Sequence, residues 1–84
     1  AATVLYRSLL LAKKLVEQGE RDANAIINQM QELIESEPLA EIDYVEIVSV
    51  QDLEKLDKIE GDMLIALAVF VGDTRLIDNV MLTV

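Results

Sequence analysis

Residues 61–79 of the chain read GDMLIALAVFVGDTRLIDN. Nine apolar residues in a row, Met63–Val71, stand between Gly61 and Gly72, and this length suits a buried strand better than a helix. Because the run shows no alternation of apolar and polar residues, we expect a strand that is covered on both faces or is central in its sheet. Gly72-Asp73 is a two-residue loop typical of hairpin turns, so a second strand should return directly after it.

The returning strand should place its apolar residues on one face. Residues at every second position form this face, namely Leu76, Val80, Leu82 and Val84. Asp78 falls on the same face and interrupts it. We therefore expect a β-bulge or a hydrogen-bonding role at Asp78.

The first 40 residues have the periodicity of two helices. Apolar residues recur every three or four positions over residues 3–18 and again after Asp22, which is a good N-cap. Gly19 suits the left-handed position that ends a helix, and Pro38 disfavours helical geometry at the residue before it. The short connection predicts that the two helices pack as an antiparallel hairpin.

Residues 42–50 change to the period of a strand. Val45 and Ile47 should face one side, and Tyr44, Val48 and Val50 the other. Ser49-x-x-Asp52 is similar to a capping box and predicts a single helical turn over Leu53 and Leu56. The expected fold is one α+β domain over residues 1–84, with a two-helix hairpin layered on a small three-stranded, mainly antiparallel sheet.

Composition restricts the partners and the compartment. The 84 residues carry a net charge of −9, so nucleic acid is an unfavourable partner. Residues 41–62 hold eight acidic residues against Lys55 and Lys58, which we interpret as a solvated acidic face rather than a specific cation site. Cysteine is absent, and the apolar run Met63–Val71 is half a membrane span. We expect a cytoplasmic protein with no membrane or targeting segment.

The residues of the chain form no recognisable catalytic or metal-binding motif. Histidine is absent, the three glycines are too far apart for a phosphate loop, and no serine has a base in a known motif. Residues 52–57 resemble a calcium loop only superficially, because Leu56 stands where an oxygen ligand is needed. We therefore expect no catalytic, cofactor-binding or metal-binding residue in these 84 residues.

Arg75 lies just after the predicted turn, with Asp73 and Asp78 nearby in the sequence. One interpretation is a local ion pair, worth about 0–1 kcal/mol when exposed. The other is a contact with an anion or with another domain. The residues alone favour the local ion pair, and the second interpretation stays open.

Three segments carry a family resemblance when they are read in order. They are Asp43-Tyr44-Val45-Glu46-Ile47-Val48, then Leu53-Glu54 with Leu56-Asp57 and Ile59-Glu60-Gly61, and last Leu64–Asn79. Arg75-Leu76-Ile77-Asp78-Asn79 is the most specific part. The chain closely resembles, over essentially its whole length, the C-terminal domain of the pantothenate synthetase (pantoate–β-alanine ligase) family. Lys55 and Asp62 depart from the proline that many members have there, but both positions lie in expected loops.

The resemblance implies an activity that we do not expect this chain to carry alone. In that family ATP and pantoate form a pantoyl-adenylate, which β-alanine attacks to give pantothenate, with release of AMP and pyrophosphate. ATP and magnesium are therefore implied for a parent enzyme, whose histidine-based signature and Met-Ser-Ser-Arg-Asn-type loop have no counterpart here.

The resemblance also implies a partner. The expected partner is the N-terminal nucleotide-binding domain of the same chain, over which this domain closes as a lid, in a parent that is a homodimer. The fragment alone should be inactive. Arg75, Asp78 and Asn79 are the candidate interdomain contacts. The alternative is a free-standing acidic α+β module for protein interaction or dimerisation.

Overall fold

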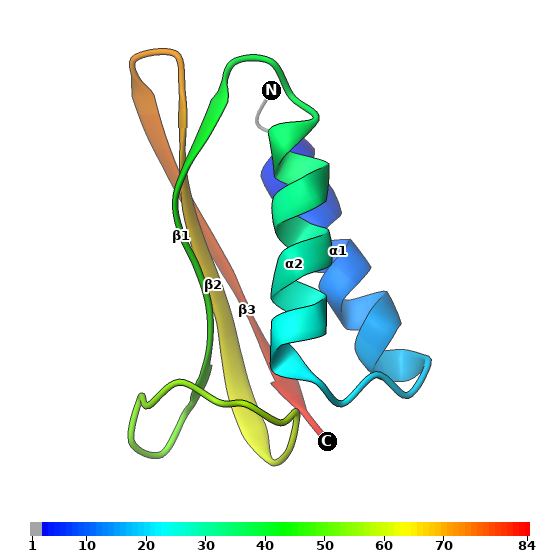
Figure 1. The fold of residues 1–84 in the computed structure, drawn as a ribbon. Coiled ribbons are helices and arrows are strands. Elements are labelled where there is room, and N and C mark those ends of the chain that lie inside the picture. The colour runs from blue at the N-terminus through cyan, green and yellow to red at the C-terminus, as the bar shows by residue number, and fades with distance from the viewer. Residues whose placement is uncertain (1–2) are drawn as a thin grey trace.

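The computed structural model describes residues 3–84 and has two layers (Figure 1). One layer is a pair of helices, α1 (Thr3–Glu17) and α2 (Ala23–Glu35). The other is a sheet of β1 (Ala40–Ser49), β2 (Asp62–Val71) and β3 (Thr74–Thr83). All strand neighbours are antiparallel, in the order β1-β2-β3. The predicted α+β fold, a helical hairpin on a three-stranded antiparallel sheet, is confirmed.

Local signals explain where the helices begin and end. The Gly19 amide donates to the Val16 carbonyl (3.1 Å) and the Glu20 amide to the Leu15 carbonyl (2.9 Å), with Gly19 at a φ of +101°. This pairing satisfies free carbonyls at the end of α1. The Asp22 carboxylate accepts hydrogen bonds from the first-turn amides of α2, as the sequence predicted for an N-cap.

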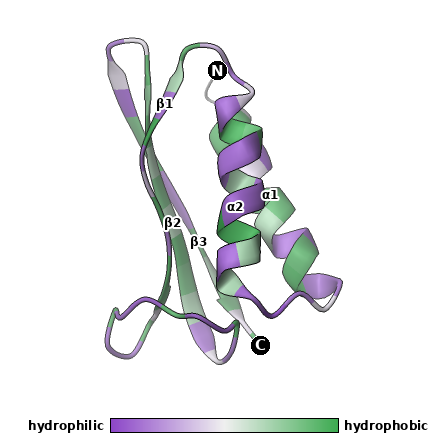
Figure 2. Cartoon of the chain, viewed as in Figure 1, coloured by the Kyte–Doolittle hydropathy of each residue, from purple (hydrophilic) through white to green (hydrophobic). Residues whose placement is uncertain are grey.

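The core lies between the helices and one face of the sheet. This inner face is formed by alternate strand residues, and α2 lies over β1 while α1 approaches β3. Fully buried side chains come from both layers: Val4, Ile26, Met30, Ile34, Ile47, Met63, Ile65, Leu67 and Val69. Figure 2 shows hydrophobic and hydrophilic bands alternating along α2, whereas β2 is hydrophobic along most of its length. No helix in the described part of the chain has the length and apolar character needed to cross a membrane.

The hairpin between β2 and β3 forms as predicted. Val71 pairs with Thr74, so Gly72 and Asp73 are the two loop residues. Gly72 has a φ of +61° and Asp73 does not have a positive φ, which matches a type II′ turn with glycine at its first central position. The register then runs without a shift to Asp62 opposite Thr83. β2 is the middle strand, which confirms the predicted alternative of a strand that is central in its sheet.

The bulge lies in β1 rather than in β3. The register shifts between Ile42 and Tyr44, which leaves Asp43 as the extra residue, and β3 is regular through Asp78. The extra residue lets Ile42 and Val45 both reach the core, although the spacing between them is odd. Of the two roles expected for Asp78, the bulge is wrong, and its carboxylate accepts a hydrogen bond from the Asn79 amide (2.8 Å).

The helical turn predicted over Leu53 and Leu56 is wrong. The Ser49 amide donates to the Glu54 carbonyl (2.9 Å) and the Leu56 amide to the Ile47 carbonyl (2.9 Å). The chain therefore folds back beside β1 as a short hairpin, in which Leu53 takes a φ of +58°. Ser49 Oγ still accepts from the Gln51 amide (3.3 Å), so the capping interaction forms without a helix after it.

Candidate functional site

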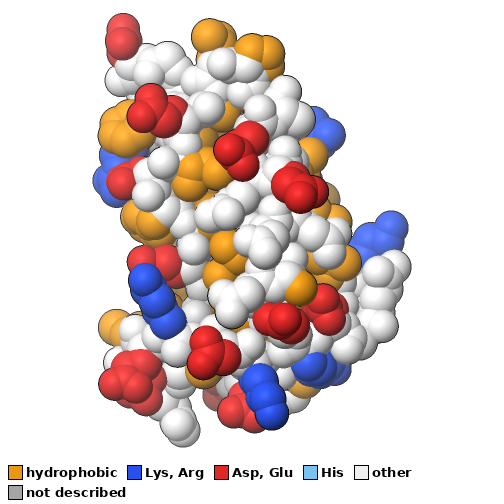
Figure 3. Space-filling model, in the orientation of Figure 1, with side chains coloured by type: hydrophobic (Ala, Val, Ile, Leu, Met, Phe, Trp, Pro, Cys, Tyr) orange, Lys and Arg blue, Asp and Glu red, His pale blue; other side chains and the backbone are white. Residues whose placement is uncertain are grey.

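The sheet has one face that no helix covers, which we call the outer sheet face (Figure 1). The register places these apolar residues on it: Tyr44, Val48, Leu64, Ala66, Ala68, Phe70, Ile77 and Met81. Three of them are well exposed: Phe70 by 38%, Ile77 by 57% and Met81 by 63%. Figure 3 shows hydrophobic side chains along the left edge of the molecule, on the side of the strands turned away from the helices.

An ion pair crosses this outer sheet face. Arg75 on β3 donates from Nε (3.1 Å) and from Nη2 (2.9 Å) to the same oxygen, Oδ2 of Asp43 on β1. The side chain reaches over the middle strand, and the Asp43 bulge supplies its partner. The local ion pair expected between Arg75 and Asp73 or Asp78 does not form, because the sheet brings a distant carboxylate closer.

The three predicted contact residues do not lie together. Arg75 and Asn79 share the outer sheet face, opposite Phe70 and Ala66. Asp78 faces the helices, in a hollow of about 350 Å³ between α1 and β3. Because β3 is an edge strand, an inward-facing charge at Asp78 disfavours pairing of that edge with a further strand.

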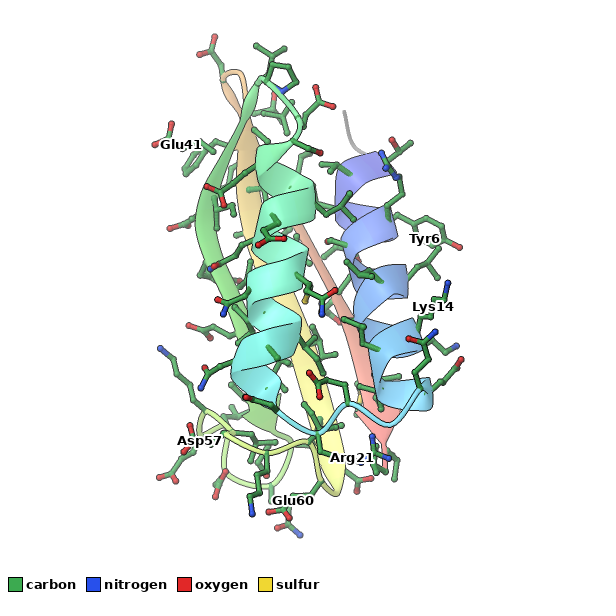
Figure 4. The ribbon with its side chains drawn as sticks, turned by 45° about the vertical axis from the view of Figure 1, so that its right-hand side comes forward. Tyr6, Lys14, Arg21, Glu41, Asp57 and Glu60 are labelled. Atoms are coloured by element: carbon green, nitrogen blue, oxygen red, sulfur yellow. The ribbon has the colours of Figure 1, made fainter. Side chains whose placement is uncertain are left out.

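The hollow beside Asp78 is lined by both layers. Its walls are Tyr6, Leu9, Leu10 and Lys13 from α1, and Asp78, Asn79 and Val80 from β3. Figure 4 shows Tyr6 and Lys14 on the α1 side of the molecule and Glu41 on the opposite side. Its polar side chains include the carboxylate of Asp78, the amine of Lys13 and the hydroxyl of Tyr6, without a serine, cysteine or histidine beside them.

The buried polar groups in the described part of the chain have structural partners. Ser8, the one buried polar residue among those described, donates its hydroxyl to the Leu5 carbonyl (2.8 Å). In residues 3–84 no three acidic, histidine or cysteine side chains gather as a metal ion requires, and no buried side-chain nitrogen or oxygen lacks a partner. At the end of the molecule where Arg21, Asp57 and Glu60 lie (Figure 4), loops enclose a second hollow of about 320 Å³. The feature that stands out is therefore the outer sheet face.

Sequence reasoning missed most of the outer sheet face. Asp43, Phe70, Ile77 and Met81 were not among the predicted contacts. The signal for Ile77 and Met81 was present, because they alternate with the core-facing Leu76, Val80 and Leu82. Asp43 carried no such signal, since its place depends on the bulge.

The architecture defines the chain as a small two-layer α+β domain with an open sheet face. The sequence pattern of the family described as Pantoate-beta-alanine ligase matches residues 1–81. The chain belongs to this family.

The relatives show how much of the family's length is present. A pantothenate synthetase from Caldicellulosiruptor saccharolyticus is 52% identical over all 84 residues, which are 30% of that protein. One from Fervidobacterium nodosum is 56% identical over 81 residues, covering 96% of this chain and 29% of the relative. A crystal structure of pantothenate synthetase from Thermus thermophilus superposes with a TM-score of 0.81 at 30% identity, over 92% of this chain and 28% of that one. The chain thus spans about 30% of the length of its relatives and matches their C-terminal part.

Proposed function

We propose that this chain is the C-terminal lid domain of a pantothenate synthetase. The observation that carries the proposal is the match of the whole chain, at 52% identity, to only 30% of a pantothenate synthetase. The whole enzyme condenses pantoate and β-alanine with ATP through a pantoyl-adenylate, giving pantothenate, AMP and pyrophosphate. The preceding N-terminal portion, which we call the catalytic portion, binds ATP and magnesium and carries the reacting groups.

The described residues support a covering role rather than a chemical one. They hold no histidine, and their serines are capping or core groups, such as Ser8 bonded to the Leu5 carbonyl. A domain that closes over a reactive acyl-adenylate assists the reaction by excluding water and by strengthening charge interactions. We propose that the isolated chain is inactive, and that the whole enzyme is a cytoplasmic homodimer.

The test is a chimera in which this chain replaces the matching C-terminal part of the Caldicellulosiruptor saccharolyticus enzyme. Formation of pantothenate from ATP, pantoate and β-alanine is measured for the chimera and for the 84-residue chain. We expect product from the chimera and none from the chain. Product from the chain alone, or a chimera that folds by circular dichroism yet forms no product, would overturn the proposal.

A second candidate is a free-standing module that dimerises through the sheet. The exposure of Phe70, Ile77 and Met81 on the outer sheet face favours it. Such a module would self-associate at micromolar concentration and would not support the chimera's activity. Light scattering of the isolated chain, compared with the chimera assay, separates the two functions.

A further inference from the structure

We infer that the outer sheet face is the surface on which this domain meets the catalytic portion of its own polypeptide. This inference rests on the proposed function and specifies its contact surface. The strands themselves supply the first argument. An antiparallel sheet with one solvated face alternates apolar residues inward with polar residues outward. β2 does not alternate, because its outward residues are Leu64, Ala66, Ala68 and Phe70.

The two helices differ in character: α1 exposes the apolar Leu10 and the ring of Tyr6, whereas α2 exposes no large apolar side chain. The well-exposed residues of α2 are all polar: Asn24, Asn28, Gln29, Glu32 and Glu35. A helix with a polar outward face is suited to water. The outer sheet face, in contrast, joins Phe70 and Ile77 to the half-buried Leu64 and Tyr44 in one apolar area. An apolar area on one side of a small domain marks an interaction surface.

The polar groups around this area form a rim. Asp43 is neutralised by Arg75 at 2.9 Å, and Glu46 has Lys55 at 3.9 Å. Glu41, opposite Phe70, is exposed and forms no ion pair with the residues that the structure describes. An apolar centre with a polar rim is the usual anatomy of a protein interface. The complementary surface should therefore be apolar, with a basic group opposite Glu41.

The occupant that fits best is the rest of the same polypeptide. Relatives are more than three times as long as this chain. In a protein of that length, the additional residues offer a large surface against which this domain can pack. A second copy of the chain is disfavoured, since each copy carries a net charge of −9 and like charges repel at an interface.

The contact can be mapped by cysteine labelling in the chimera described above. The chain contains no cysteine, so Met81→Cys and Ile77→Cys each introduce a single thiol into it, with cysteines of the catalytic portion replaced by serine. Leu53→Cys is the matched control, because Leu53 is 67% exposed and Met81 63% exposed. We measure the rate of reaction with a maleimide in the folded chimera, relative to the rate in urea.

We expect the thiols at positions 77 and 81 to react at least about tenfold more slowly than the thiol at position 53. Equal rates in a chimera that forms pantothenate would overturn this inference and leave the proposed function intact. If the thiols lose their protection on dilution while the molecular mass falls, the outer sheet face contacts a second copy. That result would also overturn the inference.

A charge substitution gives an independent readout. Met81→Glu should lower pantothenate formation by the chimera at least about tenfold, because it places a carboxylate in the proposed apolar contact. Leu53→Glu, on the loop beside β1, should leave the activity unchanged. Thermal unfolding of both variants shows whether each one folds, and equal activity of the two folded variants would contradict the inference.

Discussion

Asp22 joins the two helices and starts the second. Its carboxylate accepts from the Asn24 amide at 2.9 Å and from the Ala25 amide at 3.4 Å, which satisfies donors that have no partner within the helix. Replacement by alanine removes both bonds. Asp22→Ala should lower the free energy of unfolding by about 1 kcal/mol in urea titrations, whereas Asp22→Asn should change it by less than about 0.5 kcal/mol. An equal loss in both variants would show that charge, not capping, is what Asp22 supplies.

Arg75 and Asp43 are bonded at 2.9 Å but remain 42% and 40% exposed at their side chains. Solvent weakens such a pair, so its contribution to stability should be small. A double-mutant cycle with Arg75→Met and Asp43→Asn should give a coupling energy below about 1 kcal/mol, and it should decrease as salt is added. A coupling energy of several kcal/mol that does not change with salt concentration would mean that the pair is far more shielded from solvent than the structure shows.

The two faces of the sheet should respond differently to the same substitution. Ile65 is fully buried on the inner face, and Ile77 is 57% exposed on the outer sheet face. Ile65→Val should lower the free energy of unfolding of the isolated chain by about 0.5–1.5 kcal/mol. Ile77→Val should change it by less than about 0.5 kcal/mol. Comparable losses in urea titrations of the two variants would place the core on both faces.

The elements that could be predicted are those whose signals are local. Helical periodicity, the Asp22 cap and the Gly72-Asp73 turn each depend on neighbours in the sequence, and each forms as expected. The prediction of a helical turn after Ser49 was wrong because a capping residue suits an isolated turn as well as a helix. The conformation of this segment depends on the hydrogen bond from the Leu56 amide to the Ile47 carbonyl of β1. The capping residue gives no information about that pairing.

The candidate site was harder to predict than the elements. Arg75 was identified, but its partner was not, because the Asp43 bulge that places the carboxylate arises from sheet register. Asp78 was named with Arg75 and Asn79 as a candidate contact, yet strand alternation places it on the other face. A partner that covers the outer sheet face would lie outside these 84 residues. Their sequence indicates such a partner only indirectly, through the outward apolar residues of β2.

The chain is a compact two-layer body of 35 × 25 × 16 Å that belongs to a ligase family and spans about 30% of the length of its relatives. Its described residues pack and pair with one another and leave one apolar sheet face open. A lid fits this combination, because a lid needs a stable body and a contact surface rather than reacting groups.

The most direct test of the proposed lid role is the yield of AMP and pantothenate. Both products are measured for the chimera and for the catalytic portion without this chain, each shown to be folded by thermal unfolding. We predict that the chimera releases AMP and pantothenate in equal amounts. The catalytic portion alone should form little pantothenate, and any AMP should exceed it, because water reaches the adenylate. Equal amounts of both products from the catalytic portion alone, at the chimera's rate, would contradict the account.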